Sequence, residues 1–123
     1  MKRFGILLAI LLSACAAPPS AVEIANADYG VYPSDYQKIV KNYMGAFLFD
    51  PYTAVYENWR GPARGYSGGN FIKTEFGYRV CVDINAKNRL GAYVGRKLNY
   101  FLIRNGAVVQ ALDELYASKL CNF

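Results

Sequence analysis

The alternation of apolar and other side chains along residues 78–84 constrains the fold most strongly. Tyr78, Val80, Val82 and Ile84 alternate there with Arg79, Cys81 and Asp83. Successive side chains of a strand point to opposite faces of a sheet, so the pattern predicts a strand with one apolar face and one mixed face. Residues 98–104 predict a second strand, and Asn105-Gly106 predicts a tight hairpin turn into residues 107–111. The chain is therefore expected to build an antiparallel sheet.

Two further segments, residues 54–59 and 70–76, carry weaker strand patterns and bring the expected sheet to four or five strands. Between them, residues 65–69 read Gly-Tyr-Ser-Gly-Gly. A serine among glycines, with no histidine anywhere in the chain to activate it, predicts a flexible loop rather than a nucleophile.

One helix is predicted over residues 34–49, where Ser34 and Gln37 have the spacing of a capping box. Its apolar residues fall on one side at helical spacing: Tyr36, Ile39, Val40, Tyr43, Phe47 and Leu48. Asp50-Pro51 ends it, because the residue before proline is pushed out of the helical region. Residues 112–120 are compatible with a short C-terminal helix. The expected fold is α+β, with one N-terminal helix packed on a four- to five-stranded antiparallel sheet.

The N-terminus has the architecture of an export signal. Lys2 and Arg3 precede a short apolar run at residues 4–12. A membrane-spanning helix needs about 20 apolar residues, so this run is too short to cross a bilayer. The alternative is a buried helix of the folded domain, and two cations directly before a Leu/Ile run argue against it.

Cys15 follows this run and fits two processing routes. Ala14-Cys15-Ala16 matches the small-x-small pattern of ordinary secretory cleavage. Residues 12–15, Leu-Ser-Ala-Cys, resemble the lipobox of bacterial lipoproteins. That resemblance implies a thioether-linked diacylglycerol on Cys15, cleavage before it, and acylation of the new amino group with a chain such as palmitate. The chemistry favours lipidation because a thiol is the nucleophile that a thioether needs, and several acyl chains give stable anchoring. Ala16 resembles the pattern of export to the outer membrane, with the protein facing the periplasm.

These features divide the chain into three parts. Residues 1–14 are the predicted signal peptide, residues 15–27 the lipidated cysteine and a flexible tether, and residues 28–123 a single small α+β domain. Roughly 95 residues suffice for one small core. The net charge is +5 for the whole chain, and two of its cations lie in the leader. The remaining charge of about +3 is too low for a dedicated nucleic-acid binder.

Cys81 and Cys121 remain after processing. An even number of cysteines in an oxidising compartment predicts a disulfide, and two buried free thiols are the alternative. Two distant cysteines without any histidine do not make a zinc site. Neither a metal nor a cofactor is expected.

Three stretches resemble a family of small proteobacterial lipoproteins of largely unknown function. They are Asp-Tyr-Gly-Val-Tyr-Pro at residues 28–33, Asp-Pro-Tyr-Thr-Ala at 50–54, and the segment at 81–95 that contains Asn-Ala-Lys-Asn. The resemblance covers residues 28–95 and implies a periplasmic lipoprotein domain. It supplies no catalytic residues.

The charge around Asn-Ala-Lys-Asn is one-sided. Lys87, Arg89, Arg96 and Lys97 flank one predicted turn, and no acidic residue occurs between Ile84 and Leu112. On one surface these four cations would form an anion-binding patch for lipid phosphates, peptidoglycan carboxylates or an acidic protein. The alternative is a solvated strand face whose charges prevent aggregation.

Catalytic groups are scarce. The chain has no histidine and no Cys-x-x-Cys, and although residues 65–69 have the spacing Gly-x-Ser-x-Gly, their serine lacks a histidine partner. Carboxylates such as Glu75 and Asp83 would act only if the fold paired them. The sequence therefore favours a non-catalytic, outer-membrane-anchored module whose partners are the membrane, through its lipid, and an envelope protein or peptidoglycan. A small-ligand-binding or inhibitor domain that uses aromatic residues such as Trp59 and Tyr66 is the alternative function.

Overall fold

The computed structural model describes residues 17–69 and 72–123. Within them the chain has an α+β fold, with a four-stranded antiparallel sheet in the order β1-β2-β3-β4 and three short helices. In chain order the elements are α1 (Ala21–Asn26), α2 (Tyr36–Gly45), β1 (Val55–Gly69), β2 (Ile72–Asn85), β3 (Lys97–Arg104), β4 (Ala107–Leu112) and α3 (Glu114–Leu120). The sheet confirms the α+β prediction and its lower strand number. No helix in the described ranges is long and apolar enough to cross a membrane.

The two weak strand predictions were wrong in their boundaries. Of the predicted strand 70–76, the described residues 72–76 do not form a separate strand, because β2 continues through Gly77 into the strongly alternating segment. Residues 65–69 belong to β1 and pair with β2, so the predicted flexible loop is wrong as well. Gly77 interrupts the apolar pattern for a packing reason: a Cβ placed on it would lie 2.5 Å from the backbone oxygen of Ile103.

One face of the sheet packs against α2. Its core consists of alternate residues of β2 and β3 together with one residue of the helix: Val80, Val82, Ile84, Phe101, Ile103 and Val40. Several partly buried aromatic side chains surround this core. Trp59 and Tyr56 are among them, and their rings stack on each other. Trp59 is therefore a packing residue on the α2 face.

The opposite face is also covered, where the sequence predicted a mixed face. Cys81, Tyr100 and Leu102 point to this side and pack against Ala117 and Cys121 at the C-terminal end of the chain. The predicted disulfide is formed: Cys81 and Cys121 have a Cα–Cα distance of 6.0 Å, and both are buried. The domain thus has two small cores, one on each side of the sheet.

The helices differ from the prediction in number and extent. α2 lies inside the range 34–49 but begins at Tyr36 after Asp35, whose side chain forms no capping hydrogen bond. The capping box of this chain is instead at α1, inside the predicted tether. There the Ser20 hydroxyl accepts a hydrogen bond from the Glu23 backbone, and the Glu23 carboxylate accepts one from the Ser20 backbone. A helix therefore occupies part of the segment expected to be flexible.

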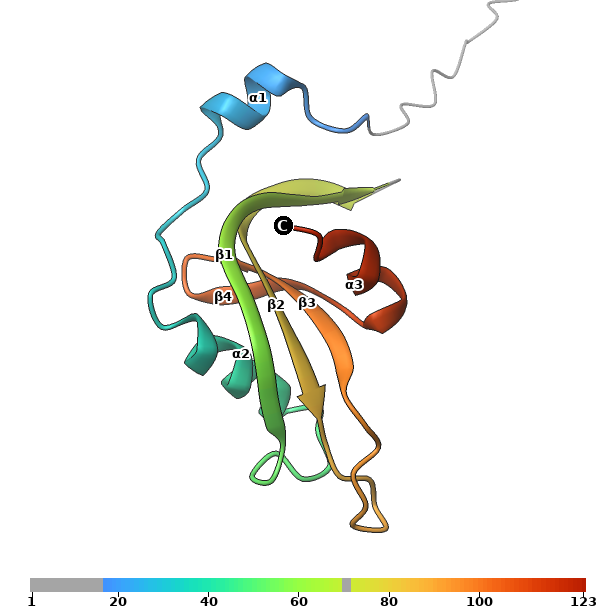
Figure 1. Cartoon of the computed structure of the whole chain (residues 1–123). Helices are drawn as coiled ribbons and strands as arrows, with labels where there is room; N and C mark the ends of the chain where they lie inside the picture. Colours follow the sequence, from blue (N-terminus) through green and yellow to red (C-terminus); the bar gives the residue numbers. More distant parts are fainter. Residues whose placement is uncertain (1–16, 70–71) are drawn as a thin grey trace, which may run out of the picture.

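The β1–β2 hairpin extends beyond β3 and curls (Figure 1). Two of the three register shifts in the β1–β2 pairing, between Glu57 and Arg60 and between Arg60 and Ala63, bend β1. β2 pairs with β3 only from Tyr78 onward, so the distal part of the hairpin is a two-stranded ribbon. In Figure 1, α1 lies beyond one side of this ribbon and α3 lies inside its curl.

Candidate functional site

The segment that carries α1 is fixed to the curled ribbon through Tyr29. The Tyr29 ring is buried and meets Phe76 edge-on at 5.5 Å between centroids. Its hydroxyl donates a hydrogen bond to the backbone oxygen of Ile24 in α1 at 2.7 Å. One tyrosine therefore holds the helix against the domain.

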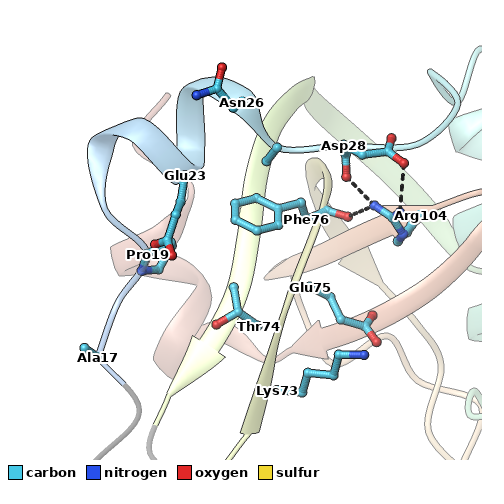
Figure 2. Close-up of a pocket in the computed structure, with 11 residues that line it drawn as sticks. Ala17, Pro19, Glu23, Asn26, Asp28, Lys73, Thr74, Glu75, Phe76 and Arg104 are labelled. Carbon is cyan, nitrogen blue, oxygen red and sulfur yellow. Dashed lines mark hydrogen bonds and ion pairs between the residues drawn. The ribbon is translucent and has the colours of Figure 1, made fainter.

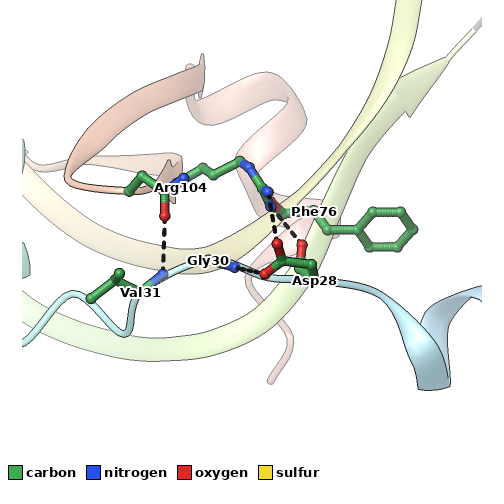
Figure 3. A network of polar contacts seen from close by, with 6 residues as sticks. Asp28, Gly30, Val31, Phe76 and Arg104 are labelled. Atoms are coloured by element: carbon green, nitrogen blue, oxygen red, sulfur yellow. Dashed lines mark hydrogen bonds and ion pairs between the residues drawn. The ribbon is translucent and has the colours of Figure 1, made fainter.

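A second attachment joins Asp28 to β3 (Figure 3). The Arg104 guanidinium lies 3.5 Å from the Asp28 carboxylate and also donates to the backbone oxygens of Asp28 and Phe76. The Asp28 carboxylate in turn accepts a hydrogen bond from the Gly30 backbone at 2.8 Å. These contacts join residues 76 positions apart in the sequence and fix where the N-terminal arm enters the domain.

A hollow of about 660 Å³ lies between α1 and this network (Figure 2). Its lining carries both charge signs, with Glu23, Asp28 and Glu75 opposed by Lys73 and Arg104. The Arg104 guanidinium is already occupied by Asp28 and Phe76. The hollow has an excess of one carboxylate and no free guanidinium, so its chemistry does not select one class of ligand.

A second hollow of about 820 Å³ shares α1 with the first and extends to α3. Its walls are mostly aromatic and aliphatic, with arginine side chains and no acidic residue. Residues from the α1 side include Tyr29, Arg64 and Tyr66, and those from the α3 side include Arg79, Tyr100 and Tyr116. It is the concave aromatic pocket that a ligand-binding role requires.

The two arginines reach this hollow from opposite sides of the ribbon. Arg64 pairs with Tyr78, so its side chain lies on the face of the sheet that carries Val80. Arg79 is the next residue after Tyr78, so its side chain lies on the other face, with Cys81. The Arg64 guanidinium lies over the Tyr29 ring at 5.1 Å, and the Arg79 guanidinium lies over the Phe123 ring at 4.3 Å. They do not form a two-armed clamp, so each end of the hollow has one cation.

Tyr100 lies beside Arg79 at the α3 end. Burial raises the pKa of Tyr100 to about 12, and the charge of Arg79 lowers it in part. The hydroxyl therefore stays protonated at neutral pH and can donate a hydrogen bond. No donor or acceptor for it is found within residues 17–69 and 72–123.

The four predicted patch residues lie in one hairpin, residues 85–97, which we call the basic hairpin. The backbones of Lys87 and Tyr93 pair in an antiparallel β-bridge. The Lys87 ammonium lies 5.2 Å from the centre of the Tyr93 ring. The tip is held by Asn88, whose side-chain oxygen accepts hydrogen bonds from the backbone of Leu90 and Ala92. Arg89 is exposed at this tip.

The other two patch residues diverge. Arg96 forms an ion pair of 2.7 Å with Glu57, and Glu57 belongs by register to the face of Leu98 and Cys81. Lys97 pairs with Ile84 and lies near α2, on the opposite face. The basic hairpin therefore has two cations at its tip and two others separated by the sheet, rather than one continuous patch of four.

This placement predicts an order of effects for charge reversal. Arg89→Glu should change the free energy of unfolding by less than about 0.5 kcal/mol, because the side chain is exposed. Arg96→Glu should cost up to about 1 kcal/mol, because it sets a second carboxylate beside Glu57. Urea denaturation measures both values. In co-sedimentation with anionic vesicles Arg89→Glu should have the larger effect, and equal losses would contradict the division of the patch.

Three of the other candidate residues named from the sequence lie in strands β1 and β2. Cys15 lies outside the described residues. Ser67 is buried in β1, and its hydroxyl accepts a hydrogen bond from the Glu75 backbone. Glu75 and Asp83 are eight positions apart on β2, roughly 26 Å along an extended strand, which is too far for a glycosidase pair. Among the described residues, no group of three His, Cys, Asp or Glu side chains could hold a metal ion.

The hollow beside α3 was missed by sequence reasoning, which placed the cations of interest at the basic hairpin. Arg79 belongs to the alternating strand that the sequence predicted, and the pattern places it on the face opposite Val80 and Val82. That face is covered by α3, which lies far away in the sequence, and the hollow is completed by α1. Tyr66, named as a ligand-binding candidate, does line the hollow.

In comparisons with known proteins, no family model, no curated protein and no solved structure matches this chain. The case for a function therefore rests on the chain's own residues.

Proposed function

We propose that this protein is a lipoprotein of the outer membrane, anchored through Cys15 and facing the periplasm, which acts as a non-catalytic interaction module of the cell envelope. The observation that carries the proposal is the cysteine directly after a short apolar leader with two cations at its start. A thiol at that position is the group that a diacylglycerol thioether requires.

The disulfide supports export. Disulfides form and persist in oxidising compartments such as the periplasm and are rare in the cytosol. The Cys81–Cys121 bond links β2 to the C-terminal end of the chain, within the second core. A domain that depends on such a bond is suited to the compartment to which the leader would send it.

The anchor is tested by Cys15→Ser. We expect this change to abolish labelling with a radioactive fatty acid and to leave the unprocessed precursor, because serine cannot form the thioether. Soluble protein of mature size from this variant would instead show ordinary secretory cleavage.

Ala16→Asp is the matched control for the sorting prediction. It leaves the nucleophile intact, so lipid labelling and processing should persist. An acidic residue after the lipidated cysteine should retain the protein in the inner membrane, which membrane fractionation on a density gradient measures. Outer-membrane recovery of this variant would contradict the role given to Ala16.

For the partner, we propose an anionic envelope component that the exposed tip of the basic hairpin contacts. Lys87 and Arg89 provide two cations on a hairpin that Asn88 holds rigid. Cross-linking in intact cells should capture an envelope protein or peptidoglycan with the wild type and less of it with Arg89→Glu. Equal capture by both proteins would count against the hairpin.

The second candidate function is binding of a small ligand, and the hollow of about 820 Å³ favours it. Ligand sites are concave, mostly apolar, and have a few polar groups that fix orientation. The uncharged fluorophore N-phenylnaphthylamine tests it directly. Saturable binding of one probe per chain would support a ligand-binding domain, and no binding would remove it.

A further inference from the structure

We propose that the α3 end of the 820 Å³ hollow binds a small organic anion with an apolar body, and that the Arg79 guanidinium contacts its anionic group. The inference rests on the second candidate function and adds the chemical class of the ligand and the residue that selects it.

Arg79 is held in place while part of its hydrogen-bonding capacity stays free. Its Nε donates a hydrogen bond to the Arg64 backbone oxygen at 3.0 Å, and its guanidinium stacks on the Phe123 ring. The side chain also crosses Gly65 so closely that a Cβ there would lie 2.3 Å from it. These contacts fix the plane of the guanidinium, so little rotamer entropy is lost when it binds an anion.

The terminal nitrogens of Arg79 are available. The ion pairs of the described residues join Arg96 to Glu57 and Arg104 to Asp28, and Arg79 takes part in neither. The Arg79 side chain is only partly buried, so water can reach these nitrogens and an anionic group can replace that water. A carboxylate, sulfonate or phosphate would match the geometry of these donors.

The surroundings of Arg79 define the rest of the ligand. Tyr100 and Gln110 add neutral hydrogen-bonding groups on the same face of the sheet, and Leu112, Tyr116 and Leu120 supply apolar walls. The lining contains no aspartate or glutamate to compete for the guanidinium. By contrast, the neighbouring hollow of about 660 Å³ contains three carboxylates. The charge balance therefore favours an anionic head group with an aromatic or hydrocarbon body.

Two fluorescent probes separate the two parts of the proposal. Anilinonaphthalenesulfonate and N-phenylnaphthylamine share their ring systems and differ by the sulfonate. The folded protein should bind the sulfonate probe about tenfold more tightly, because hydrogen bonds between charged groups are stronger than those between neutral groups. Equal affinities would leave a ligand site and overturn its anion selectivity. Failure of both probes to bind would overturn the site and the second candidate function together.

Arg79→Gln locates the contact. It should weaken the sulfonate probe by about tenfold while leaving the uncharged probe within about twofold, which shows that the pocket is still formed. Lys38→Gln, which removes an exposed cation on α2 that does not line the hollow, is the control and should change neither affinity. If Arg64→Gln weakens the sulfonate probe and Arg79→Gln does not, the anionic group lies at the α1 end and the assignment to Arg79 is wrong. Losses of equal size in Arg79→Gln and Lys38→Gln would show general electrostatic attraction and overturn the proposal.

Discussion

Replacing Cys81 and Cys121 together by alanine is expected to destabilise the domain by about 4 kcal/mol. The disulfide closes a loop with a sequence separation of 40 residues, and the loop-entropy estimate for that length gives this value. Small domains have a free energy of unfolding of about 5–15 kcal/mol, so a large share of it is lost. Both cysteines are also buried in the second core, so their replacement removes packing as well as the cross-link. The variant should be largely unfolded at 37 °C.

Urea denaturation of the oxidised wild type, the reduced wild type and the double alanine variant measures this loss. Reduction should reproduce most of the effect, which separates the cross-link from the packing of the sulfur atoms. Ser118→Ala, an exposed position on α3, is the control and should change little. A loss below about 1 kcal/mol in the double variant would mean that the α3 core is stable without the bond.

Gly77→Ala is expected to have the second largest effect, a loss of about 3 kcal/mol or more. The added methyl group would lie 2.5 Å from the Ile103 backbone oxygen and 3.1 Å from the Ile103 carbonyl carbon. Backbone atoms of a central strand cannot rotate away as a side chain can, so β2 and β3 must separate locally. Overpacking of a well-filled core typically costs 1–3 kcal/mol, and a clash with backbone lies at the upper end.

Gly45→Ala is the matched control for this substitution. Gly45 is the last residue of α2, and a Cβ there would meet nothing within 4 Å. Alanine should stabilise the domain by up to about 1 kcal/mol, because glycine loses more backbone entropy in a helix. The two alanine variants should thus shift the unfolding midpoint in opposite directions. Equal small changes would show that the β2–β3 contact relaxes without cost.

The local patterns predicted the centre of this fold correctly. Alternation along residues 78–84 and the Asn105-Gly106 turn depend on neighbouring residues, and both appear in the sheet as expected. Gly77 misled the prediction because its reason, a close approach of Ile103, comes from another strand. The capping box at Ser20 and Glu23 was a local signal that the proline-rich surroundings obscured.

The candidate site was harder to predict than the fold. Sequence proximity grouped Arg96 and Lys97, yet strand alternation and the Glu57 ion pair separate them across the sheet. The hollow beside Arg79 depends on α1, the curled ribbon and α3, which no short segment encodes together. Long-range packing decides which cations remain available, so a count of basic residues along the chain could not identify them.

Helix α1 also sets the distance between the domain and a bilayer. Its six residues span about 9 Å as a helix, against about 20 Å for the same residues extended. With Cys15 lipidated as proposed, residues 16–19 add at most about 14 Å. Tyr29 and Asp28 then hold the N-terminal arm on the domain, so the distance between the domain and the bilayer is short. The hollow that α1 helps to line would therefore lie close to the lipid head groups. Amphiphilic anions partition into that layer, and the domain would meet them at a local concentration far above that of the surrounding aqueous phase.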